Sequence, residues 1–169
     1  MSLAKWFYGP SLLDSDGLYS VSKERELRAG ANIDCYRNLN RPHSFSVKSR
    51  EGINKGLVTG YGRAIVIAEP SFVVSEKSRQ RVILERRKNV HSYVRGKLVD
   101  MFDGDLVLKN VPAFIRASYS PYAGSSFFQL ERDDALNPIA ESIRPLPSSV
   151  LENRSLAIVN GADVFLVLR

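Results

Sequence analysis

The chain has 169 residues, 24 of them Lys or Arg and 18 Asp or Glu, which gives a formal net charge of +6 and a pI of about 9.6. A chain of this length can bury about 70% of its unfolded surface, so it needs neither a disulfide nor a structural metal to fold, and its lone cysteine, Cys35, excludes an intramolecular disulfide. No apolar run approaches the roughly 20 residues that span a bilayer, so we expect one domain over residues 1–169, no membrane association, and residence in a cytoplasm or in a particle made there.

Residues 1–30 are predicted to form an N-terminal arm. Three consecutive aromatic residues stand near its start: Trp6, Phe7 and Tyr8. Exposed aromatic clusters cost solubility unless they are covered, so these side chains either dock on their own domain or serve assembly with a neighbouring copy. Residues 22–28 are predicted to form a helical turn or two that ends at Gly30.

Short strands are predicted from residue 33 onward. Their ranges are 33–39, 44–49, 57–68 and 71–74. Gly60 and Gly62 lie within this region, and glycine at that density in a strand indicates a bulge or a close approach of two backbones.

All of the net charge lies in residues 79–97. Seven Lys or Arg stand there against one acid, Glu85, which leaves seventeen residues of each sign in the rest of the chain. The first part of this region, residues 75–88, is predicted as a short helix with Ser75 as its N-cap and Glu76 in its first turn. Its only apolar residues are three in a row at 82–84, so a strand there is the alternative.

The second part, residues 89–98, alternates as a strand does. One face is small and apolar, and the other is basic and aromatic. A basic and aromatic face suits a polyanion, because cations bind phosphates and rings stack on bases. It is also ordinary on the solvent side of a half-buried strand, where Lys and Arg discourage edge-to-edge pairing. The residues predicted to contact nucleic acid are Arg79, Arg81, Arg86, Arg87, Lys88, His91, Tyr93, Arg95 and Lys97.

Two hairpins are predicted after the basic region. Asp103 and Gly104 separate the apolar runs 97–102 and 105–109, and Asp-Gly suits a type I′ turn. The second hairpin lies at about residues 155–169. Its last strand is nearly all apolar, so it must be covered on both faces.

The remaining segments complete a β-rich chain. Strands are expected at 111–118 and 127–130, with a Tyr- and Ser-rich loop at 119–126 between them, and an extended connection at 131–155. The pattern as a whole predicts a mainly β fold, a β-sandwich or partly open barrel, with one or two short helices.

Catalytic and metal-binding motifs are sparse. The chain has two histidines and one cysteine, so no metal site is expected, and no cofactor-binding or hydrolase motif is present. A metal-independent phosphodiesterase could use His91 as general base, with Tyr93, Arg95 or Lys97 stabilising the phosphorane.

One stretch resembles proteins of bacterial viruses. The run at residues 86–96, RRKNVHSYVRG, together with CYRNL at 35–39 and YSPY at 119–122, is similar to a set of uncharacterised small proteins of bacterial viruses and mobile elements over about residues 34–125. This resemblance implies a viral or mobile-element origin, and hence a location in the cytoplasm of a bacterial host or in the virion. It implies no function.

From these observations we expect a non-enzymatic viral or mobile-element protein that contacts nucleic acid or takes part in particle assembly, with nucleic acid and other protein subunits as its partners. Two alternatives stay open. One is a metal-independent nuclease centred on His91, and the other is an inhibitor protein of a host defence nuclease.

Overall fold

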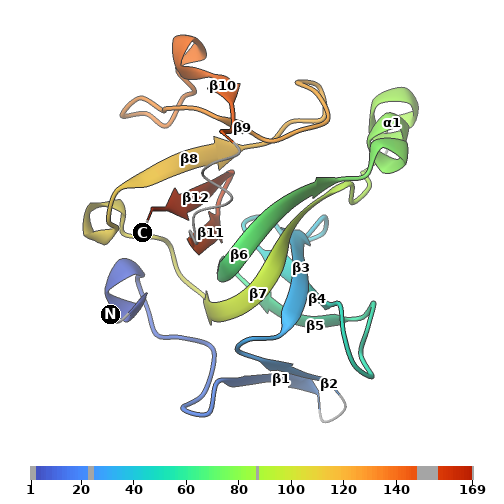
Figure 1. The fold of residues 1–169 in the computed structure, drawn as a ribbon, viewed down its shortest axis with the longest axis vertical. Coiled ribbons are helices and arrows are strands. Elements are labelled where there is room, and N and C mark those ends of the chain that lie inside the picture. Colours follow the sequence, from blue (N-terminus) through green and yellow to red (C-terminus); the bar gives the residue numbers. More distant parts are fainter. Residues whose placement is uncertain (1–2, 23–24, 87, 148–155, 169) are drawn as a thin grey trace.

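Within the described residues, ten strands form one large antiparallel sheet and two more form a separate hairpin (Figure 1). The computed structural model describes residues 3–22, 25–86, 88–147 and 156–168. The order of the large sheet is β10-β9-β8-β12-β11-β6-β7-β3-β4-β5. The sheet curls strongly, but among the described residues its two edges do not pair, so it is not a closed barrel. The prediction of a mainly β fold is confirmed.

The strands are β1 (Leu18–Ser22), β2 (Arg25–Arg28), β3 (Asn32–Arg37), β4 (Phe45–Ser49), β5 (Val58–Gly62), β6 (Ala64–Val74), β7 (Ser92–Phe102), β8 (Phe114–Ser118), β9 (Phe128–Gln129), β10 (Arg144–Pro145), β11 (Leu156–Asn160) and β12 (Asp163–Val167). One α-helix, α1 (Glu76–Glu85), and three short 3₁₀ turns complete the described part. The 3₁₀ turns are η1 (Leu3–Trp6), η2 (Leu108–Asn110) and η3 (Ala140–Ser142). Over the residues that the structure describes, no helix has the length and apolar content to cross a membrane.

The longest strand pair carries the helix. β6 and β7 have 11 residues each, pair antiparallel, and are joined through α1, which projects beyond their ends (Figure 1). The register shifts between Ala68 and Ser71, where Glu69 has a φ of 52°. Gly96 lies opposite this bulge, and a Cβ there would lie 2.5 Å from Ile67 Cγ2 and 2.6 Å from the Ala68 carbonyl oxygen. Glycine is therefore the residue that lets β7 pass the bulge.

The final hairpin lies in the middle of the sheet. β11 pairs with β6, and β12 pairs with β8. Successive residues of both strands alternate between two apolar clusters, one on each face of the sheet. The predicted hairpin is confirmed, and the chain's own residues cover both of its faces.

The described residues of the segment 22–28 are not helical. Arg25–Arg28 forms strand β2, which pairs with β1, and Leu27 is 2% exposed within the core. The predicted helical turn was wrong because burial of this single leucine and pairing with β1 outweigh the helix preference of Glu and Arg.

The predicted Asp103-Gly104 hairpin was also wrong. Residues after Gly104 turn away from β7 and pair with the N-terminal arm: the Tyr8 N–H donates to the Asp105 carbonyl at 3.0 Å, and the Val107 N–H donates to the Trp6 carbonyl at 2.6 Å. A Cβ on Gly104 would fall 1.8 Å from the Tyr8 carbonyl oxygen. This glycine therefore serves the close approach of the arm, and not a two-residue turn.

Candidate nucleic-acid interface

Helix α1 stands at the tip of the β6–β7 hairpin and buries none of its residues. Its start is as predicted: Ser75 is the N-cap, and the Ser78 N–H donates to its hydroxyl oxygen at 3.4 Å. Arg79 ties the helix to the following loop, because its Nε donates to the Pro121 carbonyl at 2.9 Å and its Nη1 lies 2.7 Å from Glu76 Oε1. The helix is thus anchored through one side and otherwise faces solvent.

Three cations in and just beyond the second half of α1 have no carboxylate partner within the described part of the chain. They are Arg81, Arg86 and Lys88, and all three are exposed. Arg86 ends the helix in the left-handed conformation, with a φ of 53°. Arg87, which the sequence also placed in this set, lies outside the described residues. The three exposed cations can bind phosphates without first breaking an ion pair.

The cations of β7 differ. Arg95 makes a two-pronged contact with Asp34 on the neighbouring strand, with Nε 2.8 Å from Oδ1 and Nη2 3.2 Å from Oδ2, and this bonding raises the Arg95 pKa. Lys97 Nζ lies 3.2 Å from Glu69 Oε2. The structure therefore does not gather the predicted basic residues on one face: carboxylates hold Arg79, Arg95 and Lys97.

His91 precedes the strand instead of lying within it. β7 begins at Ser92, so the predicted strand is shorter at this end. His91 Nδ1 lies 2.8 Å from the Asn89 carbonyl oxygen. Because a carbonyl only accepts, Nδ1 carries a proton, and in the neutral tautomer that this bond selects Nε2 presents a lone pair. That Nε2 is buried and has no hydrogen-bond partner among the described residues.

Tyr93 is half-buried and packs edge-on against Tyr36, with ring centroids 5.7 Å apart. Burial raises the pKa of both phenols, and the nearby Asp34 charge raises the Tyr93 pKa further. Tyr93 therefore stays neutral at physiological pH, which suits a packing and hydrogen-bonding group better than a nucleophile.

A cavity of about 220 Å³ lies between two parts of the curled sheet. β3, β7 and the residues just before β7 form one wall, and β8, the loop after it and the β11–β12 turn form the other. Six ring side chains line it: Tyr36, Phe45, His91, Tyr93, Tyr119 and Phe127. The Tyr119 ring stacks on Phe127 at 5.0 Å and lies 5.3 Å from the His91 ring. Aromatic rings therefore make up a substantial part of the cavity lining.

A wider depression adjoins this cavity on the side of α1. It shares Leu39, Asn89 and His91 with the cavity, and its other lining residues are Val82, Ile83, Arg86, Lys88 and Tyr122. Tyr122 is 76% exposed at its rim. Two of the three unpaired cations thus line the approach to the aromatic cavity.

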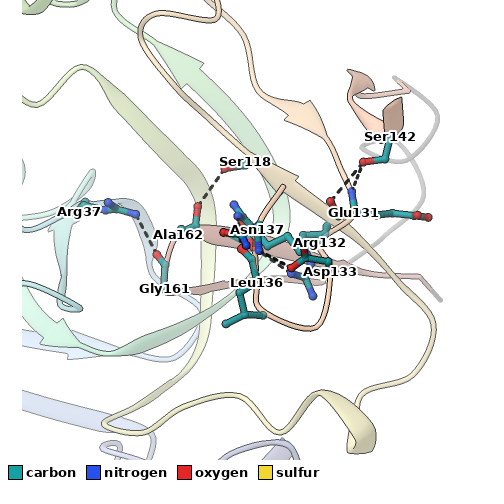
Figure 2. A network of polar contacts seen from close by, with 12 residues as sticks. Arg37, Ser118, Glu131, Arg132, Asp133, Leu136, Asn137, Ser142, Gly161 and Ala162 are labelled. Atoms are coloured by element: carbon teal, nitrogen blue, oxygen red, sulfur yellow. Dashed lines mark hydrogen bonds and ion pairs between the residues drawn. The ribbon is translucent and has the colours of Figure 1, made fainter. Parts of the chain in front are cut away.

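Polar contacts fix the far wall of the cavity (Figure 2). Arg37 Nη2 donates to the Gly161 carbonyl at 3.2 Å, which links β3 to the β11–β12 turn. Asp163 lines the cavity but is buried, and both of its oxygens accept bonds of 2.7 Å from Arg132, with Arg116 Nη1 at 3.5 Å. Two arginines therefore compensate this carboxylate.

Sequence reasoning missed this cavity. Its walls come from segments more than a hundred residues apart. Of its lining residues, only His91 and Tyr93 were predicted from the sequence to contact a ligand.

The three N-terminal aromatic residues separate. Trp6 and Phe7 are 4% and 5% exposed, and the Phe7 ring stacks on Phe102 at 3.9 Å. Docking on their own domain therefore accounts for these two side chains. Tyr8 is 67% exposed, so it alone of the three is available for contact with another molecule.

Comparison with known proteins gives one family. A family model described as the Mycobacterium phage L5 gene 82 protein matches residues 26–142. The gene 82 protein of Mycobacterium phage L5 is 32% identical to the chain over 100 residues, which cover 56% of this chain and 75% of that protein. No solved structure matches the chain. The predicted resemblance to bacterial-virus proteins is confirmed, and the family match extends beyond residues 34–125 on both sides.

Proposed function

The chain belongs to the family of the Mycobacterium phage L5 gene 82 protein, and we propose that it binds single-stranded nucleic acid without cleaving it. The observation that carries this proposal is the position of unpaired cations beside an aromatic cavity: Arg86 and Lys88 line the depression that adjoins it. Cations attract the phosphate backbone, and ring faces stack on bases.

Single strands fit this arrangement better than a duplex. Base faces are accessible for stacking only where they are unstacked and unpaired, and the rings here lie inside a cavity and a depression instead of on a ridge that fits a groove. Arg81, Arg86 and Lys88 lie in and just beyond the second half of α1, and three cations suit a short tract of backbone.

Binding without cleavage is supported by the surroundings of His91 and Tyr93. The Nδ1 of His91 is committed to Asn89, and its Nε2 is buried. Asp163, the carboxylate in the cavity wall, is held by Arg132 and Arg116. A general base and a separate general acid, both within reach of a phosphodiester, are the minimum for hydrolysis without a metal. Among the described lining residues there is no second histidine, and the one carboxylate is already held by arginines.

The proposal is tested by a salt titration of binding to short random single-stranded DNA, single-stranded RNA and duplex DNA. The variant Arg81→Gln/Arg86→Gln/Lys88→Gln removes the three unpaired cations. Each phosphate contact on a single strand contributes about 0.7 to the slope of log K against log salt, so the slope of this variant is expected to be about 2 smaller than that of the wild type.

A matched control removes three exposed lysines elsewhere, in Lys5→Gln/Lys55→Gln/Lys109→Gln. It has the same change in net charge and is expected to keep most of the affinity. Equal losses in the two triple variants would indicate a response to net charge alone and contradict the proposed interface. Tighter binding to duplex than to single strands would contradict the proposed substrate, and release of cut products that His91→Phe abolishes would favour the nuclease.

A further inference from the structure

We infer that the aromatic cavity accepts one unstacked nucleobase of the bound strand. This inference rests on the proposed function and specifies what the cavity contributes to it. The volume of about 220 Å³ corresponds to about seven water molecules at their liquid volume of roughly 30 Å³ each, so a flat ring system has room to enter.

The first argument is the pair of buried polar atoms without partners. His91 Nε2 and Tyr119 Oη both belong to cavity-lining residues, and neither finds a hydrogen-bond partner within the described chain. Buried polar groups are normally paired, so two such atoms on neighbouring rings indicate a site whose hydrogen bonds are completed by a ligand.

The two atoms have complementary roles. His91 Nε2 is an acceptor, because the proton of the neutral ring is on Nδ1. Tyr119 Oη donates as well as accepts, and burial raises its pKa, which keeps that proton in place. An N–H beside a carbonyl or ring nitrogen, the pattern along a base edge, offers a donor for the first atom and an acceptor for the second.

The second argument is the arrangement of rings. Tyr36 and Tyr93 belong to one wall, and Tyr119 and Phe127 belong to the other. Aromatic rings contributed from two separate parts of the sheet favour a flat aromatic guest, and stacking of this kind tolerates any base.

The third argument is charge. Arg37 lines the cavity, and Arg86 and Lys88 line the depression that leads to it. The one described carboxylate in the cavity wall, Asp163, is compensated by two arginines. A base that enters the cavity keeps its phosphate outside, where these cations are available to it.

The test compares a short single strand with the same strand lacking one central base. Wild type is expected to bind the intact strand about tenfold more tightly, as stacking of one base implies. Tyr119→Phe keeps the ring and removes only the hydroxyl, whereas His91→Phe keeps a ring but removes Nε2 together with Nδ1 and its bond to the Asn89 carbonyl. Both variants are expected to bring this ratio toward one with an unchanged salt slope. Tyr8→Phe, an exposed tyrosine outside the cavity, is the control and keeps the wild-type ratio.

Folding of the two variants is checked by thermal unfolding. Tyr119→Phe removes only a buried polar atom that lacks a partner, so it is not expected to unfold earlier than the wild type. His91→Phe also loses the bond from Nδ1 to the Asn89 carbonyl, so it is expected to unfold slightly earlier while remaining folded at the assay temperature. A strand with the fluorescent base 2-aminopurine at the central position gives a second readout. The fluorescence of 2-aminopurine changes when the base leaves its stack and contacts the cavity rings. This change is expected only in proteins with the intact site.

Each outcome has a distinct meaning. If the wild type binds the intact strand and the strand lacking a base with equal affinity, and its salt slope is as expected, the inference of a base-accepting cavity is wrong. The proposal of single-strand binding then still stands. A ratio that survives in both His91→Phe and Tyr119→Phe also overturns the inference of such a cavity, because the base is then recognised elsewhere. Absence of binding to either strand overturns the proposed function itself.

Discussion

The cations of β7 and those of α1 belong to one run of sequence but have different surroundings. Arg95 and Lys97 each contact a carboxylate from another strand segment, Asp34 and Glu69. Arg81 and Arg86 contact none among the described residues and stand on a helix that buries nothing. A cluster of positive charge in a sequence therefore describes two kinds of residue, those that hold the fold and those that are available to a polyanion.

The largest expected effect that separates the two regions is on stability. Arg95→Ala leaves Asp34, 11% exposed, with only Arg50 at 3.8 Å, so we expect a loss of about 3 kcal/mol in the free energy of unfolding. Arg86→Ala breaks no described ion pair and is expected to change it by less than about 0.5 kcal/mol. Denaturant titration of both variants measures this contrast, and equal losses would show that the two regions do not differ as described.

The backbone of β7 is expected to be less tolerant than that of α1. Gly96→Ala places a methyl group 2.5 Å from Ile67 and against the Ala68 carbonyl, and such overpacking costs about 2 kcal/mol. Leu84→Ala on α1 removes a side chain that is 76% exposed and should be nearly neutral. Thermal unfolding of the two single variants compares them. A neutral Gly96→Ala would mean that β6 relaxes around its bulge at little cost.

The smallest effect is expected at the exposed ion pair of β7. Lys97 and Glu69 have side chains that are 51% and 68% exposed, so their attraction is well screened. Lys97→Gln should lower the free energy of unfolding by about 0.5 kcal/mol or less and leave strand affinity close to that of the wild type. A large fall in affinity would show that Lys97 exchanges Glu69 for phosphate, and would add β7 to the interface.

Local signals in the sequence predicted much of the framework. The Ser75 cap and first-turn Glu76 fixed the start of α1, and alternating apolar residues around the turn at 160–162 predicted the final hairpin. The Asp103-Gly104 signal failed because the same dipeptide also permits a close backbone approach, here by Tyr8. Turn chemistry is a local preference, and the arm that decided between the two uses lies almost a hundred residues away.

The site was harder to predict because its determinants are contacts between distant strands. The register of β3 against β7 sets Asp34 beside Arg95, and nothing in the basic run itself reveals that pairing. The cavity likewise needs β3, β7, β8 and β12 in place together before His91 and Tyr119 come within 5.3 Å. The residue types in the sequence indicated basic and aromatic binding groups. Which of these residues lie in the same site depends on the order and register of the strands.

The position of β11 and β12 between β6 and β8 bears on how the chain is made. Residues 156–167 are synthesised after β6, β7 and β8. Until they are added, β6 and β8 each lack the neighbouring strand that they have in the folded protein. The β11–β12 hairpin pairs with both strands. It thereby joins β8, and Tyr119 after it, to the same sheet as β7. The nascent protein therefore gains its cavity in a single late step, and a chain stalled before that step would expose two apolar strand edges to chaperones and to other nascent chains.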